Sequence, residues 1–118
     1  LYIRLRDSDE RGYSNCISCG VKKLYTDMDA GHFIPKNKGL AVYFLEDNIH
    51  SQCPGCNRYL HGNLYRYGKA LEMKIGSKRI DELEALSKTT KKFTLVEYQA
   101  MIDYYRDEID KQRKNKLL

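Results

Sequence analysis

Two pairs of cysteines constrain the folding of this 118-residue chain more than any other feature of its sequence. Cys16 and Cys19 form one C-x-x-C motif, Cys53 and Cys56 form a second, and these are all of its cysteines. Two residues between thiolates allow a tight turn, called a knuckle here, to direct both sulfurs toward one ion. Two knuckles predict a tetrahedral four-cysteine zinc site. Because thiolates then fill all four coordination positions, we expect the zinc to be structural.

The alternative for the same cysteines is a pair of disulfides. Disulfides within a C-x-x-C motif are mostly redox-active, and nothing else in the sequence indicates secretion. A chain of this length forms one small domain with a modest core, which benefits from a metal staple. The zinc interpretation is therefore favoured.

Charge and hydropathy narrow the class of protein. The formal net charge is +5 and the isoelectric point is near 9.0, which favours an anionic partner such as nucleic acid, an acidic protein or a lipid surface. No apolar run approaches the roughly 18 residues that span a bilayer, and no signal peptide is recognisable. We expect a soluble cytoplasmic protein with no membrane partner. The chain begins at Leu1 rather than at methionine, which is compatible with a fragment of a longer protein.

Residue patterns predict an α+β fold. Residues 28–34 favour a strand that ends before Pro35, and residues 40–45 favour a second strand or an extended loop. A helix is expected from about Pro54 to residue 60, because proline is tolerated in a first helical turn. The order is strand, loop, strand, helix, with zinc at both ends. Further helices are expected at 63–75 and near 80–86, whereas residues 1–15 remain undecided between a strand and the end of a helix.

The last helix has the clearest signals. Thr94 with Glu97 three residues later forms a capping box. Apolar side chains then recur at three-and-four spacing: Leu95, Tyr98, Ile102, Tyr105 and Ile109. Such a stripe packs against a core or forms a dimer seam. The basic tail at 111–116 is either a solvated end or a contact for phosphates. We expect residues 1–76 to form a zinc-stapled core and residues 77–118 a helical extension of the same domain.

Three residues near the knuckles can carry hydrolytic chemistry. His32 ends the first expected strand, and a neutral imidazole with a pKa of about 6.5 can take a proton from water at physiological pH. Its alternative role is to cap a carbonyl group or to pack against Phe33. Asn57 directly follows the second knuckle, so its amide oxygen is a candidate ligand for Mg²⁺ or Mn²⁺. Asn48 is a candidate brace for the loop that orients His32.

The other two histidines and several basic residues are further candidates. His50 alternates with Asn48 on an extended segment, and His61 follows Asn57 by four residues on one helical face. Either histidine can complete a cation site; His50 is otherwise a hydrogen-bonding brace, and His61 an exposed residue at a helix end. Candidate phosphate contacts, which are otherwise solvated charges, are Lys36, Lys38, Arg58, Arg66 and Lys69.

A combination of motifs gives a family resemblance over roughly residues 16–75: C-I-S-C-G, A-G-H-F, Y-F-L-E-D-N-I-H-S-Q-C-P-G-C-N and G-N-L-Y-R-Y-G-K-A-L. Together they resemble the phage NinG/Rap recombination proteins, within the His-Asn-His (HNH, or ββα-metal) endonucleases that carry a four-cysteine zinc site. Phage endonuclease VII is more distantly similar. The resemblance implies a ββα-metal hairpin-helix core followed by packing helices.

The same resemblance implies a function. The expected activity is metal-dependent hydrolysis that nicks branched recombination intermediates, including Holliday junctions and displacement loops. The implied catalytic residues are His32, Asn48, His50 and Asn57, and the implied partners are branched DNA, a second copy of the chain and a recombinase. Two alternatives remain: a non-enzymatic zinc-knuckle module that binds DNA or protein, and a generic HNH nicking endonuclease.

The sequence departs from the HNH pattern at one position. Many HNH enzymes have a metal-binding aspartate directly before the base histidine, where this chain has Gly31. Asp29 lies two positions earlier, on the same face of the expected strand, and is one candidate for the missing ligand. His50 is the other.

Overall fold

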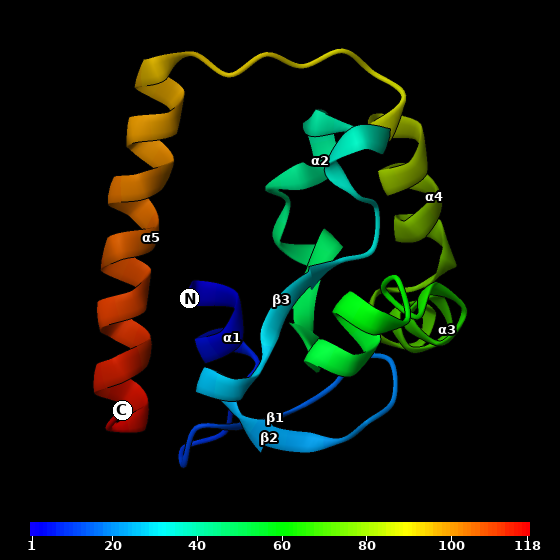
Figure 1. Ribbon diagram of the computed structural model, residues 1–118. Helices are drawn as coiled ribbons and strands as arrows, with labels where there is room; N and C mark the ends of the chain where they lie inside the picture. The colour runs from blue at the N-terminus through cyan, green and yellow to red at the C-terminus, as the bar shows by residue number, and fades with distance from the viewer.

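The fold contains two short antiparallel sheets: the β3–β4 sheet lies among the helices, and the β1–β2 sheet lies at one end of the molecule (Figure 1). The computed structural model describes residues 1–118. Strand β1 (Tyr13–Asn15) pairs with β2 (Lys22–Leu24), and β3 (Asp29–His32) pairs with β4 (Ile49–Gln52). The α-helices are α1 (Tyr2–Arg6), α2 (Leu40–Tyr43), α3 (Leu64–Ile75), α4 (Ser77–Ser87) and α5 (Leu95–Lys116). No helix combines the length and the apolar composition that crossing a bilayer requires.

Shorter turns connect these elements. Three 3-10 turns cover Tyr25–Asp27, Lys36–Lys38 and Glu46–Asn48, and a π-helical turn covers Gly55–Tyr59. The α+β fold class is thus confirmed, as are the helical turn after the second knuckle and the end of α3 before Gly76, where φ is 85°. Residues 1–15, which the sequence left undecided, form α1 and β1.

The prediction of a second strand at residues 40–45 is wrong. The partner of β3 is β4, in a register that pairs Gly31 with His50, whereas residues 40–43 form the short helix α2. Strand β4 is Ile-His-Ser-Gln, and all four residues are buried although three are polar. Its sequence therefore lacks the alternation of polar and apolar residues that predicts a half-buried strand. The helical turn of α2 places Val42 in a buried cluster with Ile34 and Leu83.

The outer edge of β4 is covered by two other segments. The Ser51 N–H donates to the Asp7 carboxylate at 2.8 Å, and the Ser51 carbonyl accepts from the Ile17 N–H at 3.0 Å. The Arg6 guanidinium donates to the carbonyl of Ile49 at 2.7 Å. A strand with an unpaired edge would leave these groups unsatisfied, so α1 and the first knuckle complete the sheet.

Helix α4 joins the same core as the strands. Leu83 packs against Ile34 and Val42. The approach is close at Gly39, where a Cβ atom would lie 2.6 Å from the Ser87 carbonyl oxygen. A residue with a side chain at position 39 would push α2 and α4 apart.

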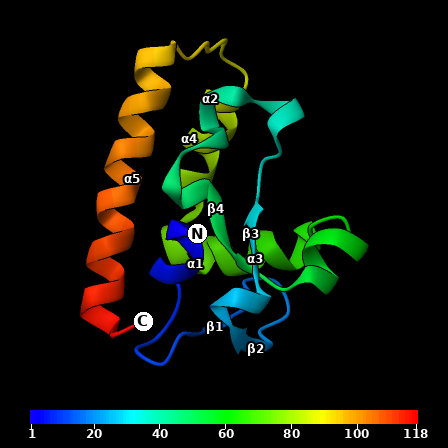
Figure 2. The same cartoon turned by 60° about the vertical axis from the view of Figure 1, so that its left-hand side comes forward.

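Helix α5 lies along one side of the molecule and is joined to α4 by an extended segment (Figures 1 and 2). Its capping box is confirmed, because the Glu97 N–H and the Thr94 hydroxyl lie 3.1 Å apart and the Thr94 N–H donates to the Glu97 carboxylate at 3.1 Å. The Tyr105 ring packs against Tyr2 with centroids 5.0 Å apart, whereas Leu95 is 87% exposed. The apolar stripe therefore contacts the rest of the chain mainly through its C-terminal half.

The C-terminal end of α5 is anchored to α1 by one lysine. The Lys116 ammonium donates to the carbonyls of Leu5 at 2.6 Å, Ser8 at 2.7 Å and Arg6 at 3.3 Å. These carbonyls lie at and just after the C-terminal end of α1, near the negative end of the helix dipole, and the Leu5 carbonyl also accepts from the Ser8 hydroxyl at 2.7 Å. Burial lowers the pKa of Lys116 below its usual value. One charge of the basic tail is therefore structural.

We expect Lys116→Met to lower the free energy of unfolding by about 1 kcal/mol, because three carbonyls lose a charged donor while the aliphatic stem is kept. The exposed neighbour Lys114 is the matched control, and Lys114→Met is expected to change stability by less than about 0.5 kcal/mol. Urea unfolding followed by circular dichroism measures both. Equal stability of the two variants would contradict the anchoring role.

Candidate functional site

The four cysteines converge on one point, as their spacing predicts. All four sulfurs lie within 4.8 Å of one another, and the sulfurs of Cys19 and Cys53 are 3.7 Å apart. A tetrahedral zinc ion with Zn–S bonds of about 2.3 Å places its sulfurs about 3.8 Å apart. No disulfide is present. The cluster is therefore placed to bind a metal ion, and its geometry and ligand chemistry fit zinc.

Each knuckle supports its sulfurs with backbone donors. The N–H of Cys19 donates to the Cys16 sulfur at 3.5 Å, and the N–H of Cys56 to the Cys53 sulfur at 3.4 Å. Burial opposes ionisation of Cys16, but donors that include the N–H groups of Cys19 and Cys53 lower the pKa of its thiol to about 7. Burial raises the pKa of Cys56 to about 12. A bound dication removes this penalty by neutralising the thiolates.

His32 and Asn57 line the same cleft. This cleft has a volume of about 280 Å³, and Lys36, Tyr43 and His61 also line it. His32 comes from the end of β3, whereas Asn57 comes from the π-helical turn that follows the second knuckle. The metal cluster holds the start of that turn, so it also sets the position of Asn57. The structure thus brings together two residues that the sequence assigned to one site.

The ring of His32 is fixed on two sides. Its Nε2 lies 3.0 Å from the carbonyl oxygen of Tyr43, and its ring stacks on the Tyr43 ring with centroids 4.2 Å apart and an interplanar angle of 7°. A carbonyl oxygen only accepts, so Nε2 carries the proton and Nδ1 is left as an acceptor. Burial lowers the pKa of His32, against the opposing effect of the Tyr43 carbonyl. The ring is therefore a neutral acceptor near pH 7.

Asn48 holds the long connection between β3 and β4. It is fully buried, and its amide accepts from the Ile34 N–H at 2.9 Å and donates to the carbonyls of Ile34 at 3.0 Å and Val42 at 3.1 Å. These bonds fix both ends of the segment that leads to Tyr43, the hydrogen-bond partner of His32. Asn48 therefore acts on His32 indirectly and does not line the cleft.

Asp29 lies beside Asn57 but is already engaged. One carboxylate oxygen accepts from the Asn57 amide at 3.0 Å, and the two oxygens accept from the Arg58 guanidinium at 2.9 and 2.8 Å. Partial burial opposes ionisation, but Arg58 and Asn57 hold the pKa of the Asp29 carboxyl below its usual range. Arg58 therefore competes with any ion at Asn57 for the Asp29 carboxylate. Arg58, predicted to hold phosphate, is instead in an ion pair.

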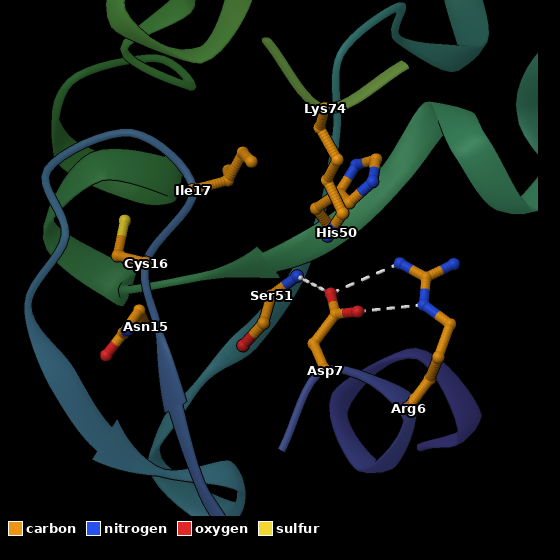
Figure 3. A pocket seen from close by; sticks show the side chains of 8 residues that line it. All are labelled: Arg6, Asp7, Asn15, Cys16, Ile17, His50, Ser51 and Lys74. Carbon is orange, nitrogen blue, oxygen red and sulfur yellow. Dashed lines mark hydrogen bonds and ion pairs between the residues drawn. The ribbon is translucent and has the colours of Figure 1, made fainter. Parts of the chain in front are cut away.

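His50 does not lie with His32, and this corrects its prediction as a ligand of the same ion. His50 pairs with Gly31, whereas His32 is the next residue of β3, so the two histidines occupy opposite faces of the hairpin. Figure 3 shows His50 beside Lys74 and the Arg6–Asp7 ion pair, in a separate pocket of about 470 Å³.

The surroundings of His50 suit a buried brace. Its Nδ1 lies 3.2 Å from the Tyr67 hydroxyl, which donates to the Gly31 carbonyl at 2.7 Å. Burial, Lys74 and Arg6 lower the pKa of His50 to about 4. The imidazole is therefore neutral at physiological pH and ties α3 to the hairpin, as in the alternative interpretation of the sequence.

His61 is an exposed residue just after the π-helical turn, as in the alternative interpretation of the sequence, and it also lines the cleft with Asn57. It has a left-handed backbone, with φ of 50°, which costs free energy for a residue other than glycine. Gly62 and Asn63 continue the left-handed stretch. The spacing of four residues from Asn57 was the available signal, although the chain between them is a π-helical turn and not an α-helix.

The remaining basic candidates, Lys36, Lys38, Arg66 and Lys69, form no ion pairs. Lys36 lines the cleft, and Lys38 lines the neighbouring groove. Lys69 on α3 lies 4.7 Å from the centroid of the Tyr65 ring, and Arg66 is exposed on the same helix.

Gly31 is required by packing. A Cβ atom at this position would overlap the side-chain oxygen of Gln52 and lie 2.9 Å from its Cδ atom. Gln52 is fully buried, and its amide donates to the Ser18 hydroxyl at 2.8 Å and the Gly62 carbonyl at 2.5 Å. Gln52 thus links the first knuckle to the His61 turn, and it occupies the space that an aspartate at position 31 would need.

One known protein family matches almost the whole chain. Residues 1–115 match the sequence model of the family described as Bacteriophage Lambda NinG protein. The chain belongs to the NinG family. Protein ninG of Escherichia phage lambda is 33% identical over 115 residues, which are 98% of this chain and 53% of that relative. Protein ninG of Salmonella phage P22 is 37% identical over an alignment of 112 residues that covers 90% of this chain and 53% of that relative.

Two further results limit what membership of the NinG family implies about this chain. The chain spans about half the length of the curated NinG relatives that it matches. No solved structure matches the chain. The NinG family resemblance in the sequence is therefore confirmed, whereas the likeness to HNH endonucleases stays a prediction.

We expect one zinc ion per chain, and we expect Cys53→Ser to lose it together with most of the thermal stability, because binding of a structural metal is coupled to folding. Metal analysis of the purified protein measures the first and thermal unfolding the second. Val21→Ala, at an exposed position beside the first knuckle, is the control and keeps the metal. A Cys53→Ser protein with unchanged zinc content would contradict the four-cysteine site.

We expect Gly31→Ala to lower the free energy of unfolding by about 1–3 kcal/mol, because the new methyl group displaces Gln52. The double variant Gly31→Ala/Gln52→Ala is expected to lose less than the sum of the single variants, since Gln52 is the neighbour that clashes. Gly68→Ala in α3 is the control: its Cβ meets Phe33 at an ordinary 3.4 Å, and we expect no loss. Strict additivity, measured by urea unfolding, would contradict the proposed clash.

Proposed function

We propose that this protein is a divalent-cation-dependent DNA endonuclease that nicks branched recombination intermediates, including Holliday junctions and displacement loops. The observation that carries the proposal is the cleft in which His32 and Asn57, from different elements, lie together. The motifs that resemble HNH endonucleases assign the base to His32 and a cation ligand to Asn57. The neighbouring cysteine cluster, filled by structural zinc, leaves no open coordination position for chemistry.

His32 is the general base of this proposal. Its Nε2–H is held by the Tyr43 carbonyl, so Nδ1 accepts the proton of the attacking water. Because burial lowers the pKa of His32, the ring stays neutral at pH values where an unperturbed histidine is half protonated. Asn48 is a positioning residue, since it holds the segment that presents Tyr43.

The residues that would hold the catalytic cation are Asn57 and His61, with Asp29 as a further ligand when Arg58 releases it. The amide nitrogen of Asn57 donates to Asp29. The amide oxygen of Asn57 is not part of this bond, so it is the atom that would bind the ion. Bound Mg²⁺ or Mn²⁺ supplies charge neutralisation at the phosphate. Phosphate of incoming DNA is a natural competitor for Arg58, and the exchange would free the Asp29 carboxylate.

Phosphate contacts by Lys36, Lys38, Arg66 and Lys69 give affinity without base preference, which suits an enzyme that selects DNA by shape. A two-fold symmetric junction calls for two active sites. We therefore propose that the protein dimerises through the exposed half of the α5 stripe, which includes Leu95, Tyr98 and Ile102. We also propose that it acts together with a recombinase in the cytoplasm of the host cell.

The test compares the parent protein with His32→Ala on a labelled four-way junction and a linear duplex, with Mg²⁺ or Mn²⁺. The parent is expected to nick the junction in preference to the duplex, and His32→Ala to be slower by about 10²–10⁴-fold, the usual contribution of a general base. Tyr104→Ala, exposed on α5, controls for a general effect of substitution. Zinc content and melting temperature must match among the three proteins.

The other possible outcomes of this cleavage test each contradict a different part of the proposal. Equal cutting by His32→Ala overturns the base assignment, and equal cutting of duplex and junction favours a generic nicking endonuclease. Binding to the junction with no cutting by any of the proteins favours a zinc-knuckle module without enzymatic activity.

That module is the second candidate function, and one observation favours it. The single carboxylate beside Asn57, that of Asp29, has both oxygens engaged by Arg58, and the four cysteines are the only clustered metal-binding side chains. In this candidate, Asn57 and His32 stabilise the hairpin and the basic surface binds DNA.

A further inference from the structure

A groove beside the candidate active site has features that phosphate binding does not explain. The groove has a volume of about 550 Å³ and shares Pro35 and Leu64 with the His32 cleft, so the two hollows are neighbours. It lies between the end of β3, the start of α3 and the end of α4. The Phe33 and Tyr65 side chains contribute aromatic surface to it.

Tyr65 is placed for binding and not for packing. Its side chain is 75% exposed, at the first turn of α3, although a tyrosine of a small domain is stabilised by burial. Lys69, one turn later, holds its ammonium 4.7 Å from the centre of the Tyr65 ring. An exposed aromatic ring with a neighbouring cation is the arrangement on which proteins stack nucleobases.

The charge of the groove matches a polyanion. Lys38 and Lys88 line the groove where α2 and α4 approach each other at Gly39 and Ser87, and Glu84 is the one acidic residue of the lining. A lining that combines apolar and aromatic side chains with two lysines suits a ligand that has a flat apolar part and phosphates. A paired duplex keeps its bases stacked inside and presents phosphates, so it makes no use of the aromatic surface.

We propose that this groove binds one unpaired nucleotide of a DNA strand, with its base stacked on Tyr65 and its flanking phosphates near Lys38 and Lys88. The inference rests on the proposed function for the position of the cut, because the shared residues Pro35 and Leu64 place the unpaired nucleotide near the scissile phosphate. Every base offers a face for stacking, so the groove recognises the absence of pairing and not a base sequence. Displacement loops and forks contain unpaired strands, and Tyr65 is therefore a determinant of selectivity for branched DNA of this kind.

The experiment measures binding without cutting, by fluorescence anisotropy in Ca²⁺, for a fork with unpaired arms and a paired duplex of equal length. Tyr65→Ala is expected to weaken binding to the fork about tenfold and to the duplex less than twofold, from the usual contribution of one stacked base. Tyr65→Phe keeps the ring and is expected to bind both DNAs as the parent does. The matched control is Tyr59→Ala, which removes a ring that is 79% exposed and outside both hollows.

Three results would overturn the inference: unchanged binding of the fork by Tyr65→Ala, an equal loss for fork and duplex, or the same loss in Tyr59→Ala. The cleavage assay with Mg²⁺ is run in parallel and separates this inference from the proposed function. If the parent protein does not cut but Tyr65→Ala still loses its preference for the fork, the nuclease fails and the nucleotide groove stands.

Discussion

The convergence of four cysteine sulfurs is the interaction on which the rest of the structure depends. The two sheets have strands of three and four residues, and hairpins of that size are not stable alone in water. The cysteine cluster joins the turn between β1 and β2 to the end of β4, so each sheet restrains the other. The turn that carries Asn57 begins at the second knuckle. The metal site therefore sets both the stability of the centre and the position of a candidate ligand.

The β3–β4 hairpin separates two kinds of polar site. On the face of His32, the cleft contains a neutral imidazole with a free acceptor nitrogen, together with Asn57 and His61. On the opposite face, His50 lies beside Tyr67, Lys74 and the Arg6–Asp7 pair. Its Nδ1 is within hydrogen-bonding distance of the Tyr67 hydroxyl. The two-residue period of a strand explains the separation of the two histidines: His50 pairs with Gly31, and the neighbouring residue His32 lies on the opposite face.

Predictions from the sequence succeeded where the signal was local. The C-x-x-C spacing, the Thr94–Glu97 capping box and the stop at Gly76 each depend on residues within one or two turns. The strand predicted at 40–45 failed because apolar content alone does not distinguish a buried strand from a short helix that buries one residue, Val42. The periodic apolar side chains of α5 predicted a helix with one contacting face. Periodicity alone does not show which part of that face contacts the rest of the chain, and here it is mainly the C-terminal half that does so.

The sequence by itself determined which atoms are available for chemistry: four thiols in two knuckles, three imidazoles, two amides near the knuckles and an excess of positive charge. Only the tertiary structure decided which of these atoms meet. The pairing of Gly31 with His50 sent that histidine away from His32, and the ion pair of Asp29 with Arg58 restricted a carboxylate that strand position alone had left available. The physical reason is that register and long-range ion pairs depend on the packing of distant segments, which local patterns do not encode.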